Sequence, residues 1–388
     1  MSSPRPPSIF IPYLTPSLSS LFSHLPPTIS LDGLSRTAPT RLQKTALPNI
    51  GAIELVSSTD FETFYDPLYT ASFPRRAERE RSDLIVERLA AQARGERAGL
   101  APYRIVGIRD LAGEAIGAAQ FSVLPVPPRR PKRPGGQPQQ LGQGEEQSNV
   151  VSAPHEDGDV RGSSAAHAFS TFKFAVPYLQ YIYVRAQNRR QDMSEVLHAM
   201  VLAVASADAA AMELEDGASS SLGAENLLRT VPFTLFETEP PDHGDDHASR
   251  AYALERSKIH TSSGGVALVL RRPKSRESGP DEAEDEILSA HVQPGLEPAD
   301  PPLTLVWVIR PSPTSTPNKD YDLTRMGKAL IAAYYQSLRD EGFPEKNIRL
   351  AERILEQRTK GSTFELTPLA DVKDFSVEQG YLDIRGGD

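Results

Sequence analysis

The hydrophobic pattern of the chain changes from that of a strand to that of a helix within residues 177–209. Residues 178–184 (YLQYIYV) are mostly aromatic or aliphatic, which favours a largely buried strand. After a polar turn, apolar residues recur three and four positions apart, at Met193, Val196, Leu197, Met200, Val201 and Val204. This spacing predicts a helix with one face in a core. A strand that enters a helix through a basic turn is suited to phosphate binding, because the first-turn amides have no partner within the helix.

The rest of the chain alternates between the same two patterns, in an order typical of an α/β fold. Strand patterns occupy residues 53–56, 103–108, 115–124, 231–237, 266–270 and 303–309. Helical spacing occupies residues 59–69, 78–92, 245–260, 323–339 and 348–357. Since a single helix links the strands at 178–184 and 231–237, we expect these two strands to be parallel neighbours in one sheet.

Polar and proline-rich stretches divide the chain into regions. Residues 125–171 have few large apolar side chains, so we interpret them as a disordered, low-complexity insertion, and residues 271–286 as an acidic loop. Residues 1–50 are poor in acid like a mitochondrial transit peptide, but their prolines oppose the amphipathic helix that such a peptide needs. We therefore expect a disordered or loosely packed arm at 1–50, an α/β domain at 51–310 and a C-terminal helical extension at 311–388.

Composition narrows the possible functions. The 388 residues include 42 basic and 51 acidic side chains, for a net charge of −9, whereas general nucleic-acid binders and membrane-surface proteins are more often basic. No apolar run predicts a membrane span. The absence of cysteine excludes disulfides, a thiolate nucleophile and cysteine-ligated zinc. We expect a cytoplasmic protein without nucleic-acid or membrane partners; mitochondrial and nuclear locations and the oligomeric state stay open.

The turn that follows residues 178–184 has a sequence that resembles a known motif. Residues 189–194 read Arg-Arg-Gln-Asp-Met-Ser. Together with the order of strands and helices, they resemble the GNAT superfamily of acyl-CoA N-acyltransferases, in which Arg/Gln-x-x-Gly-x-Gly/Ala holds the coenzyme A pyrophosphate. Asp192 stands here for the first glycine and Ser194 for the second small residue. The resemblance implies a mixed, mostly antiparallel central sheet flanked by helices, with acetyl-CoA as cosubstrate.

The resemblance also implies which residues bind acetyl-CoA. The thioester carbonyl would lie against the end of the strand, at Ile182, Tyr183 and Val184, and the phosphates against Arg189, Arg190, Gln191, Asp192, Met193 and Ser194. A local alternative exists, because Asp192-Met-Ser-Glu195 has the spacing of a capping box. In that box the Asp192 carboxylate would occupy the amides that a phosphate needs.

Three further short matches point to a GNAT-like group. They are Phe73-Pro74 in the first helical region, Glu237 and Glu239 at the end of a strand, and residues 292–296 (VQPGL), which resemble Tyr-Val-Gln-Pro-x-Leu. The resemblance implies that Glu237 is the general base and that Tyr252 protonates the departing thiolate. The alternatives are a solvated glutamate at a strand end and a buried core tyrosine.

These observations predict transfer of an acyl group, most simply acetyl, from coenzyme A to a small-molecule or peptide amine. The alternative is a GNAT-like fold that binds a ligand or partner without catalysis. His243 and His247 are four residues apart beside several aspartates, but we interpret this Pro/Gly/Asp-rich segment as a solvated loop and expect no metal.

Overall fold

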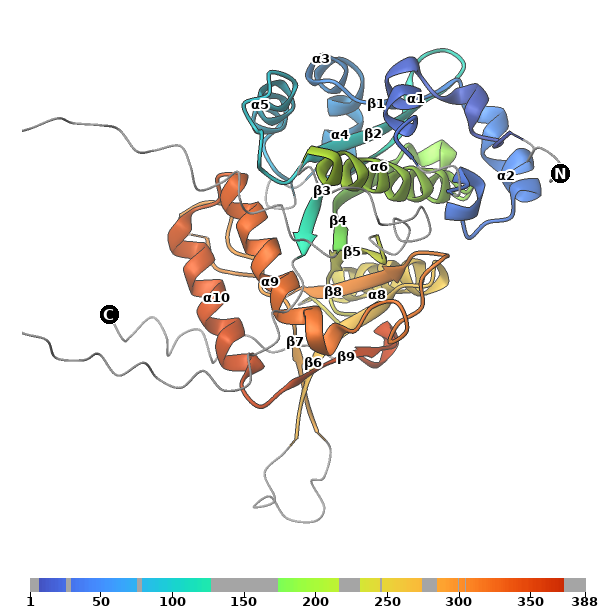
Figure 1. Cartoon of the computed structure of the whole chain (residues 1–388). Coiled ribbons are helices and arrows are strands. Elements are labelled where there is room, and N and C mark those ends of the chain that lie inside the picture. The colour runs from blue at the N-terminus through green and yellow to red at the C-terminus, as the bar shows by residue number, and fades with distance from the viewer. Residues whose placement is uncertain are drawn as a thin grey trace, which may run out of the picture.

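The computed structural model describes residues 7–25, 29–74, 79–126, 174–215, 231–244, 246–273, 285–298, 300–303 and 305–372, with no side chains for 213–215. The predicted insertion lies outside these residues from position 127 onward. So does most of the predicted acidic loop, at 274–284. The remainder is a mixed α/β structure in which helices flank a mostly antiparallel open sheet (Figure 1).

The described residues contain a nine-stranded sheet with the strand order β1-β2-β3-β4-β5-β8-β6-β7 and with β9 also paired to β6. The strands are β1 (Ala52–Leu55), β2 (Tyr103–Arg109), β3 (Ala115–Val126), β4 (Phe174–Val184), β5 (Phe233–Thr238), β6 (Val266–Arg272), β7 (Glu286–Ser289), β8 (Val306–Pro311) and β9 (Thr363–Thr367). Neighbours are antiparallel except β4 and β5, which are parallel. The prediction that these two strands are parallel neighbours is confirmed.

Every predicted helical region is helical in the structure. The α-helices are α1 (Pro16–Phe22), α2 (Pro39–Thr45), α3 (Ser58–Asp60), α4 (Asp66–Ser72), α5 (Ser82–Ala93), α6 (Met193–Glu215), α8 (His247–Ser262), α9 (Leu323–Asp340) and α10 (Glu345–Thr359). A π-helical segment, η4 (Phe61–Tyr65), joins α3 to α4. Short 3-10 helices lie at η1 (Ile11–Tyr13), η2 (Leu31–Leu34), η3 (Leu47–Asn49), η6 (Ala186–Asn188) and η7 (Leu369–Asp371).

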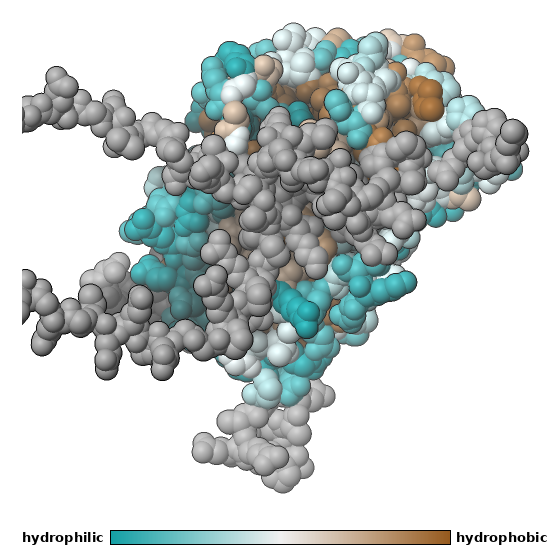
Figure 2. Space-filling model, in the orientation of Figure 1, coloured by the Kyte–Doolittle hydropathy of each residue, from teal (hydrophilic) through white to brown (hydrophobic). Residues whose placement is uncertain are grey.

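Helices cover both faces of the sheet, because successive strand residues point to opposite sides. In β3, Val123 packs with α6, whereas the next residue, Leu124, packs with α9. Ala175 and Val176 of β4 divide in the same way. One face therefore carries α6 and the other carries α9. Figure 2 shows hydrophilic residues over α10, whose outer side is charged.

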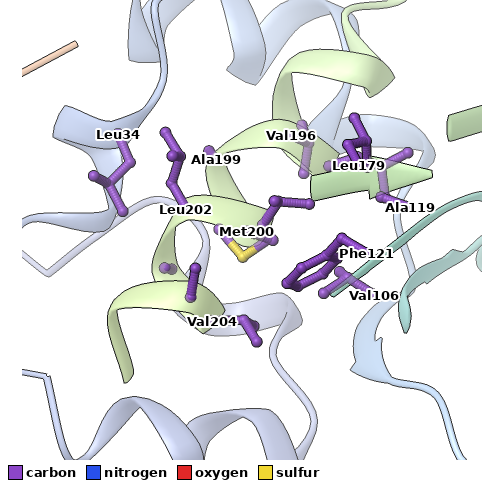
Figure 3. Close-up of a cluster of buried hydrophobic side chains, with 14 of the residues drawn as sticks. Leu34, Val106, Ala119, Phe121, Leu179, Val196, Ala199, Met200, Leu202 and Val204 are labelled. Carbon is purple, nitrogen blue, oxygen red and sulfur yellow. The ribbon is translucent and has the colours of Figure 1, made fainter. Parts of the chain in front are cut away.

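Helix α6 is the central element of the larger core. Its residues 199–205 are at most 1% exposed, and they meet the α6-facing side chains of β2, β3 and β4 (Figure 3). By length and composition, residues 193–212 could cross a membrane, but 83% of the apolar window is buried inside the molecule. Its apolar surface is thus used for packing within the protein.

The expectation of a loosely packed arm at residues 1–50 is wrong for 7–25 and 29–50. Phe10, Leu18 and Leu42 are 0% exposed and belong to the α6 core. Leu34 faces α6 from η2 (Figure 3). The prolines begin short helices, at Pro16 and Pro39, where their missing amide hydrogens cost nothing. The helical spacing of the apolar residues therefore predicted the structure of this region better than its proline content did.

The C-terminal region is helical, as predicted at α9 and α10, but it is not an extension. Helix α9 packs against β3 in the core, and β9 pairs with β6 over residues 267–271. Strand β7, which begins inside the predicted acidic loop, also pairs with β6. Strand β9 occupies one edge of β6. Strands β7 and β8 both pair with the other edge, β8 with residues 266–268 and β7 with residues 269–272. The chain that connects β7 to β8 leaves this edge.

Strands β4 and β5 pair over two residue pairs only, Tyr178 with Leu235 and Leu179 with Phe236. At this point the register of β4 against β3 shifts, and Gln180 is bulged. A bulge bends its strand and increases the local twist. Beyond Leu179 the two strands separate, and the edge of β4 that faced β5 has no strand partner among the described residues. The gap positions the site described next.

Candidate functional site

A pocket of about 410 Å³ opens where β4 and β5 separate. Side chains from both strands form its floor. The walls come from the segment between α4 and α5, the end of α9, the middle of α8 and the described residues of the segment between β7 and β8. Its lining includes Phe73, Glu80, Tyr178, Gln180, Tyr181, Glu237, Thr238, Glu239, Tyr252, Arg256, Gln293, Pro294, Gly295, Leu296, Asp300, Pro301, Leu303, Leu305, Leu338, Glu341 and Phe343. Residues far apart in sequence thus meet at one cavity.

The three short sequence matches come together in this pocket. Phe73 lines it from the end of α4, Glu237 and Glu239 from the end of β5, and residues 293–296 from the segment between β7 and β8. No local property of the sequence requires these segments to be neighbours. Their convergence identifies the pocket as the candidate functional site.

Glu237 is held by a buried aromatic cluster. One carboxylate oxygen, Oε2, bonds to Nε2 of His291, and the Glu237 side chain is only 11% exposed. The His291 ring is stacked on Trp307, with centroids 5.0 Å apart and planes at 16°. Tyr334 meets both rings edge-on. Because the cluster fixes the imidazole, it also fixes the orientation of Glu237 towards the pocket.

His291 is a candidate functional residue that the sequence interpretation missed. It is 0% exposed, and its Nδ1 has no partner among the described residues. A protonated Nε2 donates its hydrogen bond to the Glu237 carboxylate. The signal was its position, directly before Val292 of the VQPGL segment, where the motif that this segment resembles has tyrosine.

Glu239 and Tyr252 lie at the outer side of the gap. Arg256 of α8 approaches both Glu239 oxygens, at 3.0 and 2.9 Å, and stacks over the ring of Tyr252 at 5.5 Å. Tyr252 is 57% exposed, so the alternative of a buried core tyrosine is wrong. Tyr252 and Glu237 both line the pocket.

The turn at 189–194 has a backbone suited to an anion. Arg190 and Asp192 have positive φ values of 63° and 56°, which are uncommon for side chains other than glycine. Among the described residues, the backbone N–H groups of residues 190–194 have no hydrogen-bond acceptor, and those of 193 and 194 belong to the first turn of α6. Consecutive unpaired amides of this kind form concave anion sites.

The capping-box alternative for Asp192 is not formed. Its carboxylate accepts hydrogen bonds from Nε and Nη2 of Arg41, both at 2.8 Å, and from Oγ1 of Thr45 at 2.8 Å. Both partners belong to α2. The charge that we expected to compete with a phosphate is therefore turned towards the N-terminal helices, and the first-turn amides are left unoccupied by it.

The remaining residues predicted to bind the cosubstrate differ in exposure and in hydrogen-bond partners. Met193 is buried in the core, so only its backbone is accessible to a ligand, whereas Ser194 is exposed. Arg189 donates to the Val184 carbonyl at 3.2 Å. Ile182 and Val184 pack towards α6, and Tyr183 points to the opposite face, where its hydroxyl accepts from Gln120. Gln191 accepts a hydrogen bond from Asn188 at the same turn.

Helix α8 lies across from this turn. Lys258 and, more weakly, Arg190 hold the pKa of the exposed Glu255 below its ordinary value. Arg190 is therefore close enough to α8 to influence its charge. The turn and α8 flank the same gap between β4 and β5.

The described residues contain no group of three His, Asp or Glu side chains that could hold a metal ion. Comparison of the chain with models of known protein families finds no match. Neither does comparison with curated proteins or with solved structures. Functional conclusions therefore rest on the geometry of this chain.

Proposed function

We propose that this protein is an acyl-CoA-dependent N-acyltransferase, most simply an acetyltransferase, with a GNAT-like fold. The observation that supports it best is the gap between β4 and β5. A carboxylate, Glu237, faces the gap from one strand, and a turn with unpaired amides follows the other. The chain order from β1 to β8 also agrees with the order that the resemblance implies, with β7 and β9 as additions.

The acyl-CoA would enter through this gap. The amides of residues 190–194 and the guanidinium of Arg190 are suited to hold its pyrophosphate, since both supply N–H donors and positive charge. The unpaired edge of β4 beyond Leu179 offers backbone N–H groups to the thioester carbonyl. Such donors stabilise the negative charge that develops on that oxygen during attack.

The amine acceptor would lie in the 410 Å³ pocket. Glu237 takes a proton from the ammonium group and passes it to solvent, and the neutral nitrogen forms a bond to the carbonyl carbon. As the carbon–sulfur bond breaks, the nitrogen gives its second proton to Glu237. The Tyr252 hydroxyl gives a proton to the departing thiolate and recovers one from solvent. His291 holds Glu237 in place throughout and is not consumed.

Thiol release from acetyl-CoA in the presence of a mixture of amines, with mass detection of the acetylated product, tests this proposal. Glu237→Gln should lower the rate about 10²–10⁴-fold, because the amide cannot accept the proton. Glu114→Gln, an exposed site in the β2–β3 turn, is the matched control and should react at the parent rate. Product formation at an equal rate by all three proteins would show that Glu237 is not the base.

A further inference from the structure

The pocket that contains Glu237 has an excess of negative charge. Among the described residues, five carboxylates line it, and Arg256 is the only cationic side chain among the lining residues: the acids are Glu80, Glu237, Glu239, Asp300 and Glu341. They come from four separate segments of the chain, because Glu237 and Glu239 share the end of β5, so the fold gathers them at one place. Like charges at such proximity are unfavourable unless something compensates them.

The protein compensates only part of this charge. Arg88, buried behind the pocket, binds Glu80 with both nitrogens, and its Nη1 is 4.0 Å from Glu341. Arg256 pairs with Glu239. Among the described residues, Asp300 accepts a hydrogen bond from the Glu297 backbone, and no cation pairs with it. Glu237 bonds to His291, and Arg97 also interacts with Glu341, so Asp300 is the lining acid for which no cationic partner is found among the described residues.

Uncharged groups of the pocket favour a ligand that donates hydrogen bonds. Oε1 of Gln180 has no partner among the described residues, whereas Nε2 of the same side chain donates to Glu341. The free oxygen can accept a hydrogen bond. Phe73, Tyr178 and Tyr181 also line the cavity, and aromatic rings attract cations over their faces. An ammonium group, with three donors and no acceptor, matches this set.

We propose that the pocket binds an aliphatic amine with at least two ammonium groups, of the diamine or polyamine class. This inference rests on the proposed function for its choice of reacting nitrogen. The nitrogen that attacks a thioester must first be deprotonated to a neutral amine. A substrate with a single ammonium group would then carry no positive charge for the acidic pocket to bind. A second ammonium group keeps the substrate anchored, at Asp300 and Glu239, while the first is deprotonated at Glu237.

Binding can be measured without any acyl-CoA, because Trp307 is the only tryptophan and stacks on the histidine that holds Glu237. The probes are putrescine, spermidine, butylamine with one ammonium group, and γ-aminobutyrate, in which a carboxylate replaces the second ammonium. Calorimetry or Trp307 fluorescence should show the two polyvalent amines binding at least about tenfold more tightly than the other two. Salt raised from about 50 to 300 mM should weaken that binding.

Variants locate the binding to this pocket. Asp300→Asn and Glu239→Gln should each weaken putrescine binding about three- to tenfold, whereas Glu114→Gln, outside the pocket, should leave it unchanged. Equal affinity for butylamine and putrescine, or equal effects of the three substitutions, would overturn the proposal. So would binding of lysine peptides with no binding of free polyamines.

The two proposals fail in different ways. Polyamine binding that depends on Asp300 and Glu239, without any use of acyl-CoA, would keep this inference and remove the acyltransferase. Acyl transfer to monoamines at the rate found for diamines would keep the acyltransferase and remove this inference.

Discussion

At the scale of single residues, the sequence indicated Glu237 as a candidate base but gave no sign of its hydrogen bond to His291. Glu237 follows from a carboxylate at the end of a strand next to the predicted phosphate turn. His291 lies 54 residues further along the chain, in a segment that leaves the edge of β6. Only the three-dimensional course of that segment brings its imidazole to Glu237. Sequence spacing contains no signal for such a contact.

We predict that His291 acts as a positioning residue. His291→Phe keeps an aromatic ring against Trp307 but removes the hydrogen bond to Glu237. A hydrogen bond to a charged group contributes roughly 1.5–3 kcal/mol, so the rate constant kcat should fall about ten- to hundredfold. KM for the amine should stay near its parent value. An unchanged kcat would show that Glu237 needs no such support.

Asp192 shows a second limit of reasoning from residue types. The spacing Asp-x-x-Glu is typical of a helix cap, and the local sequence gives no reason to reject one. The carboxylate instead binds Arg41 and Thr45, which are about 150 residues away in the chain. A long-range ion pair therefore takes the place of a local cap, and the strand–turn–helix order was the more reliable guide to the turn.

At the scale of secondary-structure elements, periodicity predicted the helices and most strands. It missed β7 and β9, which are four and five residues long and at most partly amphipathic. Both depend on pairing with β6, so their strand character comes from a partner. The N-terminal helices were missed because composition was given more weight than the helical spacing of residues such as Leu18, Leu21 and Phe22.

We predict that the N-terminal helices contribute strongly to stability. Leu18→Ala should lower the free energy of unfolding by about 2–5 kcal/mol, because Leu18 is 0% exposed and its removal leaves a cavity beside α6. Leu111→Ala is the matched control, since Leu111 is 79% exposed, and it should change stability by less than about 0.5 kcal/mol. Urea unfolding measures both. Equal, small effects would mean that this region is not part of the core.

At the scale of the whole molecule, buried histidines link stability to pH. His198 lies in α6 with its Nε2 unpartnered among the described residues, and burial together with Arg310 and Arg36 lowers its pKa well below 6.5. Burial, with Arg256 and Arg310, also lowers the pKa of His260, to about 4. Between these values and about 6.5, the unfolded chain binds protons that the folded protein does not. Stability should therefore fall as the pH falls below about 6.5.

Urea unfolding at about pH 7.5 and pH 5 tests this linkage. His198→Phe removes one of the two histidines and should reduce the loss of stability between these pH values relative to the parent. Above about pH 6.5, His198 is neutral in both states and contributes no slope. A variant whose loss on acidification equals that of the parent would show that His198 is not linked to unfolding.

The whole fold joins two regions that the account assigns to two substrates: a turn with free amides at the start of α6, and an acidic pocket on the opposite face. The gap between β4 and β5 lies between these two regions. An acyltransferase of this kind requires the turn to bind an acyl-CoA. Binding is therefore more decisive than turnover, which also needs the correct amine.

Calorimetric titration of acetyl-CoA into the purified protein tests this claim most directly. The parent should show saturable binding to one site per chain. Ser194→Pro removes one first-turn amide, where proline is tolerated, and should weaken binding about tenfold; Ser194→Ala keeps the amide and should bind like the parent. Circular dichroism confirms that both variants fold. No detectable heat with the parent, or equal affinity of the two variants, would contradict an acyl-CoA site at this turn.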